Sequence, residues 1–410
     1  MTFFEELKWR GLIKDVAGDD IAEKLNSGNI TFYWGTDPTA DSLHLGHYSS
    51  LVTAKRLAKY GHHPILLVGG ATGLIGDPRP TAEREIISKE AVEKNLQGIK
   101  SQVERLFKGN VEVVNNYDWI KKFDFIDYLR EVGKYINVNY MLDKDIIRRR
   151  LETGITFAEF SYTLIQGYDF LHLFEEKNCI MQVAGSDQWG NMTTGIDLIR
   201  KKIGKEAYAF TMPLVLDKYG RKFGKSEGNA LWLDESKTSS YELYQYLINV
   251  DDEMVIDYLK IFTFLSKEEI EELDRKNKEH PELREAHKVL AKCIITDLHS
   301  EESYNEAVKI SESLFSGDIK NLTGKEVEQA FKGLDTYEID SDVNIVDLLV
   351  DAKICSSKRE AREFITSNSI SINGEKVTDL EFNVSKNVAI EQKYVVVRRG
   401  KKKYYIIVFK

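Results

Sequence analysis

Residues 30–47 read ITFYWGTDPTADSLHLGH, and this stretch decides the expected fold. The apolar run 30–34 leads into a polar turn, and a helix is expected from about 46 to 60. Further apolar runs at 64–70 and 179–184 alternate with amphipathic stretches. This alternation predicts βαβ units and a parallel sheet. Asp41 and Ser42 are suited to cap the helix, and Gly61 to end it.

Composition limits the class of protein. The chain has 410 residues, of which 42% are apolar, which is enough for two or three domains. Its 57 Lys and Arg residues against 66 Asp and Glu argue against a chain covered throughout by nucleic acid. The three cysteines show no paired spacing, so neither a disulfide framework nor a zinc module is expected. Without a basic leader or a long apolar segment, we expect a soluble cytoplasmic protein that binds no membrane.

The rest of the chain changes character in steps. Between 118 and 177 the pattern is helical, and its apolar positions predict one stripe: Phe125, Tyr128, Leu129, Val132 and Ile136. Residues 238–316 are again helical and highly charged, and 322–342 suggest a connector with short helices. Residues 343–410 carry 13 Lys and Arg against 8 Asp and Glu, so basic charge is concentrated at this end.

The sharpest chemical cluster is HLGH at 44–47, at the first turn of the expected helix. A helix N-terminus attracts anions, Gly46 lets a flat base approach, and the imidazoles of His44 and His47 can donate to phosphate oxygens. This suits nucleotide phosphates. Two ordinary capping or surface histidines would give the same four letters, so context must decide.

The second cluster is KFGKS at 222–226, here called the lysine motif, which follows the polar segment 217–221. A loop of this kind can be mobile. Lys222 and Lys225 can neutralise the charge that develops during phosphoryl or nucleotidyl transfer. Taken alone, a solvated basic turn explains the motif as well. The two clusters together, in this order, are much less expected by chance.

The pair resembles the signature sequences of class I aminoacyl-tRNA synthetases, and further segments resemble the bacterial tyrosyl-tRNA synthetases. These segments are YWGTDPTADSLH at 33–44, GGATGLIGDP at 69–78, NNYDW at 115–119 and GSDQWGN at 185–191. The resemblance covers nearly the whole chain. It implies a Rossmann-type parallel-sheet catalytic domain at 1–233, with a helical dimerisation insertion at about 118–160 and a mobile phosphate loop at about 217–228. It also implies an α-helical anticodon-binding domain at 234–320, a linker at 321–342 and a small α+β RNA-binding domain at 343–410.

The resemblance also implies roles for individual residues. The catalytic set is His44, His47, Lys222, Lys225, Ser226, Thr39 and Arg84. Tyr33 and Asp169 would bind the phenolic hydroxyl of a substrate tyrosine, and Asp77, Tyr162 and Gln166 its ammonium group. The other substrate-binding residues are Asp37, Asn116 and Gln182; the nucleotide-binding set is Gly35, Gly46, Gly185, Asp187, Gln188 and Lys225. A protein metal site is not expected.

Helical spacing supports part of this set. Tyr162, Gln166 and Asp169 fall at i, i+4 and i+7, so they share one helix face. An internally paired polar network or a solvated face would show the same spacing. Polar partners for the hydroxyl would favour tyrosine over phenylalanine, which would leave them desolvated and unpaired.

Two positions depart from the family pattern. Many members carry a lysine in the loop after Asp77-Pro78, whereas this chain has Arg79-Pro80 and a loop that is one residue shorter. Arg84 matches an arginine that the family uses on pyrophosphate, and Arg79 can replace the missing lysine. Trp34 stands where cysteine is common.

The C-terminal segment has its own resemblance. Basic residues occur at 358–362 and 398–403, around a predicted helix and short strands. The pattern is similar to a small RNA-binding domain found in ribosomal proteins and pseudouridine synthases. Bases grouped in this way can neutralise phosphates, although a solvated basic tail has the same composition.

These patterns lead to a functional hypothesis: a homodimer that activates L-tyrosine with ATP and Mg²⁺ and transfers it to the 3′ end of tRNA(Tyr). Two alternatives stay open. One is tryptophanyl specificity on the same architecture, against which Tyr33 and Asp169 argue because an indole has no phenolic oxygen. The other is a synthetase-derived RNA-binding or splicing protein that has lost activation, which the two intact signature motifs disfavour.

Overall fold

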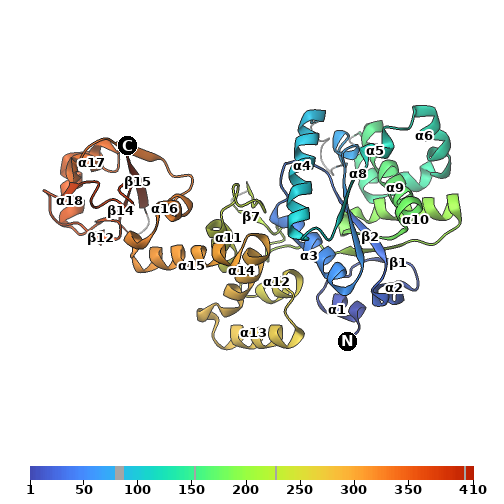
Figure 1. Cartoon of the computed structure of the whole chain (residues 1–410), viewed down its shortest axis with the longest axis horizontal. Coiled ribbons are helices and arrows are strands. Elements are labelled where there is room, and N and C mark those ends of the chain that lie inside the picture. The colour runs from blue at the N-terminus through green and yellow to red at the C-terminus, as the bar shows by residue number, and fades with distance from the viewer. Residues whose placement is uncertain (79–86, 152–153, 227–228, 401–402) are drawn as a thin grey trace. The chain divides into compact units, whose positions relative to one another are not determined.

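The computed structural model of the chain describes residues 1–78, 87–151, 154–226, 229–400 and 403–410 (Figure 1). These residues form two compact units. The first unit consists of residues 1–237 and 250–294, and the second of residues 238–249 and 295–410. The helices expected as one domain at 234–320 are therefore shared between the two units.

The first unit is built on a six-stranded sheet in the order β1-β6-β5-β2-β3-β4. Its strands are β1 (Val16–Ala17), β2 (Thr31–Thr36), β3 (His63–Val68), β4 (Glu112–Asn115), β5 (Cys179–Gly185) and β6 (Tyr208–Met212). β1 runs antiparallel to β6, and all other neighbours are parallel. The prediction of a parallel sheet is confirmed.

The strand order reverses between β2 and β5. From β2 the chain continues outward through β3 to β4, whereas β5 is followed by β6 on the opposite side. The helix α4 (Lys89–Leu106) lies on one face of the sheet, and α9 (Phe157–Lys177) and α10 (Trp189–Ile203) lie on the other (Figure 1). Ligands of such sheets bind outside the carboxyl ends of the strands where the order reverses. The ligand site is therefore expected where β2 and β5 end.

The alternation within β2 explains why the run at 30–34 is apolar except at Thr31. Trp34 points to one face and stacks on Phe107, with ring centroids 5.4 Å apart. Tyr33 points to the other face, where its ring lies 5.4 Å from that of Phe170. Both residues are buried. A strand covered on both faces by helices has apolar residues on both faces along its buried centre.

The helix after β2, α3 (Leu45–Tyr60), begins differently from the prediction. Its N-cap is His44, whose Nδ1 accepts a hydrogen bond from the backbone N–H of Gly46 at 3.1 Å. Asp41 instead pairs with Lys237. The prediction of a cap at Asp41 or Ser42 is wrong because the preceding residues are extended and pair with 231–233, so the helix cannot begin before Leu45. The prediction that Gly61 ends the helix is confirmed, with φ 117°.

The segment expected as a helical insertion is a series of short helices. They are α5 (Tyr117–Ile120), α6 (Phe125–Glu131), the 3₁₀ turn η2 (Gly133–Tyr135), α7 (Val138–Leu142) and α8 (Asp145–Leu151). The predicted single stripe is wrong, because the helix ends at Glu131 and its apolar residues separate. Val132 is fully buried, whereas the side chains of Phe125 and Leu129 are 66% and 42% exposed.

The first unit has four more helices, two before β2 and two after β6 in the chain. They are α1 (Phe3–Trp9), α2 (Ile21–Ser27), α12 (Val255–Phe262) and α13 (Lys267–Glu279). The lysine motif lies between β6 and α12 and contains β7 (Lys225–Ser226), which is followed by β8 (Asn229–Ala230). The helix α14 (Glu285–Leu298) completes the first unit and continues into the second.

The second unit contains α11 (Ser240–Ile248), α15 (Glu301–Ser316), α16 (Gly324–Ala330) and a five-stranded sheet in the order β12-β11-β14-β15-β9. The strands are β9 (Thr336–Ile339), β11 (Ile370–Ile372), β12 (Glu375–Lys376), β14 (Tyr394–Arg399) and β15 (Lys403–Phe409), with the smaller pair β10 (Val343–Asn344) and β13 (Asn383–Val384) beside the helices α17 (Ile345–Asp351) and α18 (Lys358–Thr366). β9 falls inside the segment expected as a linker, and it pairs with β15. This segment is therefore partly sheet.

Two further observations concern the chain as a whole. Cys179, Cys293 and Cys355 form no disulfide bond within the described residues. No helix in the described part of the chain has the length and apolar character needed to cross a membrane.

Candidate active site

Two buried polar side chains lie side by side on the adjacent strands β2 and β5. Tyr33 on β2 and Gln182 on β5 are register partners in the parallel ladder. Tyr33 Oη and Gln182 Oε1 are buried, and neither has a hydrogen-bond partner among the described residues. Each buried polar atom left unpaired costs about 1–3 kcal/mol. Such atoms at the point where the strand order reverses indicate a binding site for a polar ligand.

Asp169 on α9 is the charged member of this site. Its carboxylate is 1% exposed and accepts hydrogen bonds from Trp119 Nε1 at 2.7 Å and from Asn116 Nδ2 at 3.0 Å. Burial raises the pKa of Asp169 to about 7 against the lowering effect of these two donors, and the charge of Asp37 raises it further. Burial and the charge of Asp169 also raise the pKa of Tyr33. We call Tyr33, Asn116, Trp119, Asp169 and Gln182 the switch-point cluster.

Asp37, just after β2, links the cluster to the neighbouring elements. Tyr162 Oη donates to one oxygen of its carboxylate at 3.0 Å, and Thr72 Oγ1 donates to the other at 2.7 Å. Thr72 Oγ1 in turn accepts from Asn116 Nδ2 at 3.2 Å. Two carboxylates, those of Asp37 and Asp169, therefore share one hydrogen-bonded network.

The three polar residues of α9 lie as predicted on one helix. Tyr162 and Asp169 are buried and Gln166 is half-buried. Two of the three have polar partners in this site, Tyr162 with Asp37 and Asp169 with Asn116 and Trp119. The prediction that they share a face is confirmed, whereas their ligands stay a prediction.

A second group of polar residues joins Asp77 to the segment after β5. Gln188 Nε2 donates to Asp77 Oδ2 at 3.0 Å, and Asn191 Nδ2 donates to Gln188 Oε1 at 3.0 Å. Asp187 is exposed beside Gly185, where an added Cβ would lie 2.7 Å from its Oδ1. Gly185 thus leaves room for the carboxylate of Asp187 at the end of β5.

The HLGH cluster is a histidine pair at the N-terminus of α3. The rings of His44 and His47 stack with centroids 3.8 Å apart, and His47 Nδ1 accepts from the backbone N–H of His44 at 3.3 Å. Burial, and then the charges of Lys225 and Lys222, lower the pKa of His44. Burial, and then His44 and Lys222, lower the pKa of His47 to about 3. Both rings are therefore neutral near pH 7.

The hydrogen bonds also assign the tautomer. In both rings Nδ1 accepts from backbone, so the proton of the neutral imidazole is on Nε2. Each ring then presents Nε2–H as a donor at the positive end of the α3 dipole. Gly46 is exposed beside the ring of His44, where an added Cβ would lie 2.9 Å from His44 Cε1. This geometry suits an anion with several oxygens, such as a nucleotide phosphate.

The lysine motif lies directly against this helix end. An added Cβ on Gly224, whose φ is 85°, would lie 2.9 Å from the backbone nitrogen of Gly46. Leu231 N–H donates to Gly224 O at 3.0 Å, and Leu45 N–H donates to Leu231 O at 2.7 Å. Lys222 and Lys225 are exposed. Two motifs that are far apart in sequence therefore meet through their backbones.

The remaining predicted residues divide into two kinds. Gly35 and Thr39 are exposed in or after β2, where an approaching ligand can reach them. Arg79 and Arg84 lie outside the described residues, as does the rest of the loop at 79–86. The described part of the chain contains no group of three or more His, Cys, Asp or Glu side chains arranged to hold a metal ion.

Three site residues were not singled out from the sequence. Trp119 donates to Asp169, Thr72 bridges Asp37 and Asn116, and Asn191 bridges Gln188 and Thr163, whose Oγ1 lies 2.7 Å from Asn191 Oδ1. All except Thr163 lie inside segments that resemble the synthetase family, which was the available signal. Residue type was misleading, because Thr and Trp are common as plain packing residues.

Family models match most of the chain. Residues 25–316 match the model of class I tRNA synthetases (W and Y), and residues 326–407 match the model of the tyrosine–tRNA ligase SYY-like C-terminal domain. The first match covers the sheet from β2 to β6, the switch-point cluster and the two signature motifs.

Among curated proteins, the tyrosine–tRNA ligase of Streptococcus mutans is 50% identical and the two chains cover each other completely. The tyrosine–tRNA ligase of Staphylococcus carnosus is 48% identical, with 99% of each chain covered. Among solved structures, a C-terminally truncated mitochondrial tyrosyl-tRNA synthetase of Aspergillus nidulans has a TM-score of 0.68 at 31% identity, covering 77% of this chain and 94% of its own. A tryptophanyl-tRNA synthetase of Encephalitozoon cuniculi, with a TM-score of 0.54 at 15% identity, shares the fold. The chain belongs to the tyrosine–tRNA ligase family of class I aminoacyl-tRNA synthetases.

Proposed function

We propose that this chain activates L-tyrosine with ATP to form tyrosyl-adenylate and pyrophosphate, and then transfers the tyrosyl group to the 3′ end of tRNA(Tyr). In the first step a carboxylate oxygen of tyrosine attacks the α-phosphorus, and the bond from that phosphorus to the pyrophosphate oxygen breaks. In the second step a 3′-terminal hydroxyl oxygen of the tRNA attacks the tyrosyl carbonyl, AMP leaves, and the hydroxyl proton is lost to solvent. Neither step requires a nucleophile from the protein.

The switch-point cluster is the observation that supports tyrosine as the amino acid. A phenolic hydroxyl has one donor and can accept, so it pairs with an ionised Asp169 as donor and with Tyr33 Oη–H as acceptor. Both partners are already buried, and Tyr33 Oη has no partner among the described residues. Phenylalanine would occupy the same space, leave Tyr33 Oη unpaired at about 1–3 kcal/mol, and offer no donor to Asp169.

The other predicted substrate contacts follow from charge. Asp77, Tyr162 and Gln166 would hold the ammonium group of tyrosine, and Asp37 and Asn116 would support them. Gln182, Asp187 and Gln188 at the end of β5 would hold the ribose and orient the carboxylate. An anionic network of this kind, with Asp37 bonded to both Tyr162 and Thr72, favours a cationic ligand group.

The histidine pair and the lysine motif would act on ATP. Neutral His44 and His47 donate through Nε2, Gly46 admits the base, and Lys222 and Lys225 neutralise the phosphates together with Arg84. Thr39 and Ser226 complete the proposed catalytic set. Catalysis then depends on alignment and electrostatic stabilisation of the pyrophosphate leaving group.

We treat Mg²⁺ as part of the substrate MgATP. Mg²⁺ commonly keeps most of its water and is bound through substrate phosphates. Because the described residues offer no metal-binding group of three side chains, we assign it no protein ligands and derive no step through it.

Pyrophosphate exchange tests the proposal. ATP–pyrophosphate exchange is measured with tyrosine, phenylalanine and tryptophan separately, with Mg²⁺ and without tRNA. Exchange with tyrosine alone is expected. Exchange with tryptophan would support the alternative specificity, and no exchange by folded protein that binds RNA would support the non-enzymatic alternative.

We further propose a homodimer formed through the helical insertion. Exposed apolar side chains gather on this part of the chain: Phe125, Ile126 and Leu129 of α6, Val138 and Tyr140 of α7, Leu151 of α8 and Phe157 of α9. Patches of this kind mark interaction sites in soluble proteins. Sedimentation of Leu129→Asp beside the unchanged chain tests the proposal: the variant should be a monomer, and a monomeric unchanged chain would contradict it.

The domain roles stay part of the proposal. We assign 1–233 to catalysis, 234–320 to the anticodon, 321–342 to the connection and 343–410 to general RNA binding. Arg359 and Arg362 are exposed on α18, and this supports phosphate binding there. We expect tRNA affinity to fall as the salt concentration rises. Replacing both arginines with glutamine should make affinity depend less steeply on salt. The cytoplasmic location stays a prediction.

A further inference from the structure

Two buried arginines meet at the C-terminal end of α12. Arg10 is the C-cap residue of α1, and Arg56 lies in the middle of α3. Both are 4% exposed. Their only carboxylate partner in the described chain is Glu6, at 2.7 Å from Arg10 Nε and 3.7 Å from Arg56 Nη1. Two buried cations therefore share one anion.

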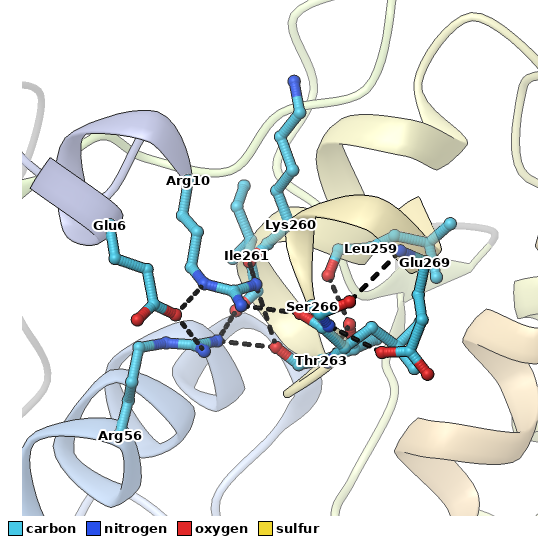
Figure 2. Close-up of polar contacts among 10 residues, drawn as sticks. Glu6, Arg10, Arg56, Leu259, Lys260, Ile261, Thr263, Ser266 and Glu269 are labelled. Atoms are coloured by element: carbon cyan, nitrogen blue, oxygen red, sulfur yellow. Dashed lines mark hydrogen bonds and ion pairs between the residues drawn. The ribbon is translucent and has the colours of Figure 1, made fainter. Parts of the chain in front are cut away.

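Backbone carbonyl oxygens, which carry partial negative charge, are the other hydrogen-bond acceptors of the two arginines. Arg10 donates to Lys260 O at 3.0 Å and to Leu265 O at 2.7 Å, and Arg56 donates to Ile261 O at 3.3 Å. Thr263 O accepts from both arginines, at 3.3 Å and 2.7 Å. Figure 2 shows the two guanidinium groups converging on this carbonyl, with Glu6 between them and the helix α1.

These carbonyls belong to the last turn of α12 and the residues that follow it. The last carbonyls of a helix have no partner within the helix and form the negative end of its dipole. Two guanidinium groups satisfy these carbonyls, while Arg56 Nε has no hydrogen-bond partner among the described residues. Next to this contact, Ser266 caps α13, with Glu269 completing the capping box (Figure 2). Arg10 and Arg56, here called the arginine clamp, thus hold α12 against α1 and α3.

The lysine motif packs against two aromatic side chains of α12. The ring of Phe223 lies 4.6 Å from that of Tyr258 and 4.8 Å from that of Phe262, both on α12. Tyr258 Oη donates to Leu216 O at 3.0 Å, just before the motif. Phe262 also stacks on Tyr48 of α3, with centroids 5.7 Å apart. The helix α12 therefore contacts both the arginine clamp and Phe223, the only buried side chain of the motif among those described.

We propose that Arg10 and Arg56 are positioning residues for the lysine motif. By holding the end of α12 on the helix that begins with His44 and His47, they set where Phe223 packs, and so where Lys222 and Lys225 stand relative to the histidine pair. The effect on catalysis rests on the proposed function. The mechanical coupling from the clamp to the motif does not.

The charge arrangement makes this coupling strong. A guanidinium group presents several donors in a fixed fork, so Arg56 can reach two carbonyls at once, which an ammonium cannot do in the same geometry. If the end of α12 moved away, two buried cations would keep one shared carboxylate, and buried unpaired charge is strongly unfavourable. The clamp therefore favours one position of α12.

The experiment uses the full chain with Arg56→Lys, and Glu6→Gln as a milder variant should the first fail to fold. Amide hydrogen exchange of Phe223 and Leu231, whose N–H groups bond to Val215 O and Gly224 O, reports on the motif. Amides of α10 serve as the internal reference. Exchange at the motif is expected to rise roughly threefold or more with α10 unchanged, because local opening free energies differ between segments.

Kinetics provide the second arm. The rate of tyrosine activation at saturating ATP is expected to fall about 10- to 100-fold in Arg56→Lys, since small misplacements of catalytic groups cost this much. The dissociation constant for tyrosine should stay within about twofold, because the switch-point cluster does not touch α12. Phe223→Leu should add little to Arg56→Lys if both act through α12.

Arg275→Gln is the matched control. Arg275 is an exposed arginine on α13 that pairs with Glu272 and Glu279, and its loss removes the same charge. It should leave motif exchange and activation unchanged. The proposal would be overturned if Arg56→Lys lowered thermal stability but left motif hydrogen exchange and the activation rate unchanged. It would also be overturned if tyrosine binding fell in parallel with activation, or if the effects of Arg56→Lys and Phe223→Leu were additive. If the unchanged chain fails to activate tyrosine, the proposed function fails, and the hydrogen-exchange arm still decides the coupling.

Discussion

Lowering the pH below 7 is expected to weaken tyrosine binding through one carboxyl group, that of Asp169. In the free protein its pKa is raised to about 7, chiefly by burial. The phenolic hydroxyl of tyrosine donates to the ionised carboxylate in the proposed complex. Binding therefore selects the ionised form, and affinity is present above pH 7 and lost as the pH falls through 7.

The size of the effect follows from the pKa. At pH 6 about nine-tenths of the free protein carries a proton on Asp169, and at pH 8 about one-tenth does. The dissociation constant for tyrosine should therefore be about tenfold higher at pH 6 than at pH 8, which is about 1.4 kcal/mol. Near pH 6 the ammonium group of tyrosine stays protonated, so it does not contribute to this change.

Titration calorimetry measures both parts of this prediction. At pH 6, in two buffers with different ionisation enthalpies, binding should release about 0.9 proton. Asp169→Asn should bind more weakly at every pH and release no proton. A dissociation constant that changes less than about twofold between pH 6 and pH 8, or the same proton release in Asp169→Asn, would refute the reasoning.

Three further predictions concern neighbouring groups. Trp119→Phe removes a donor to Asp169, so the pH midpoint of tyrosine binding should move upward in the same titration. Arg150 Nη1 and Nη2 donate to the two carboxylate oxygens of Glu159 at 2.8 Å and 3.0 Å, and Glu159→Ala removes this partner from a buried charge. The free energy of unfolding in urea should fall by about 3–5 kcal/mol. Glu176→Ala, at the far end of the same helix, should leave it unchanged. Gly224→Ala places a Cβ against Leu45 and Gly46 at a positive φ, so ATP-dependent activation should fall while calorimetric tyrosine affinity is retained.

The elements that the sequence predicted well are those governed by local pattern. The run at 30–34 was recognisable as an interior strand because four of its five residues are apolar. Gly61 ends its helix because only glycine readily takes that φ. The shared face of Tyr162, Gln166 and Asp169 follows from helical spacing alone. The two signature motifs were found as letters, and their backbone contact at Gly46 and Gly224 explains the glycines.

What the sequence did not predict depends on long-range pairing. The cap of α3 moved from Asp41 to His44 because residues 231–233 pair with the segment before the helix. The expected stripe at 125–136 separated because the helix ends at Glu131 and Val132 turns into the core. The arginine clamp has no local signature, since Arg10 and Arg56 look like ordinary surface charges until α12 is placed against them.

The central claim is that the hydroxyl of tyrosine is recognised by two buried groups, the Asp169 carboxylate and Tyr33 Oη, of which Tyr33 Oη has no partner among the described residues. The most direct test of this claim compares the unchanged chain with Tyr33→Phe. Thermal stability is measured for both, together with pyrophosphate exchange with tyrosine and with phenylalanine. Because Tyr33 Oη has no partner among the described residues, its removal should leave thermal stability unchanged or higher, while tyrosine activation falls about tenfold and the preference over phenylalanine narrows. Loss of stability with unchanged preference for tyrosine would show that the hydroxyl serves the fold, and would contradict the account.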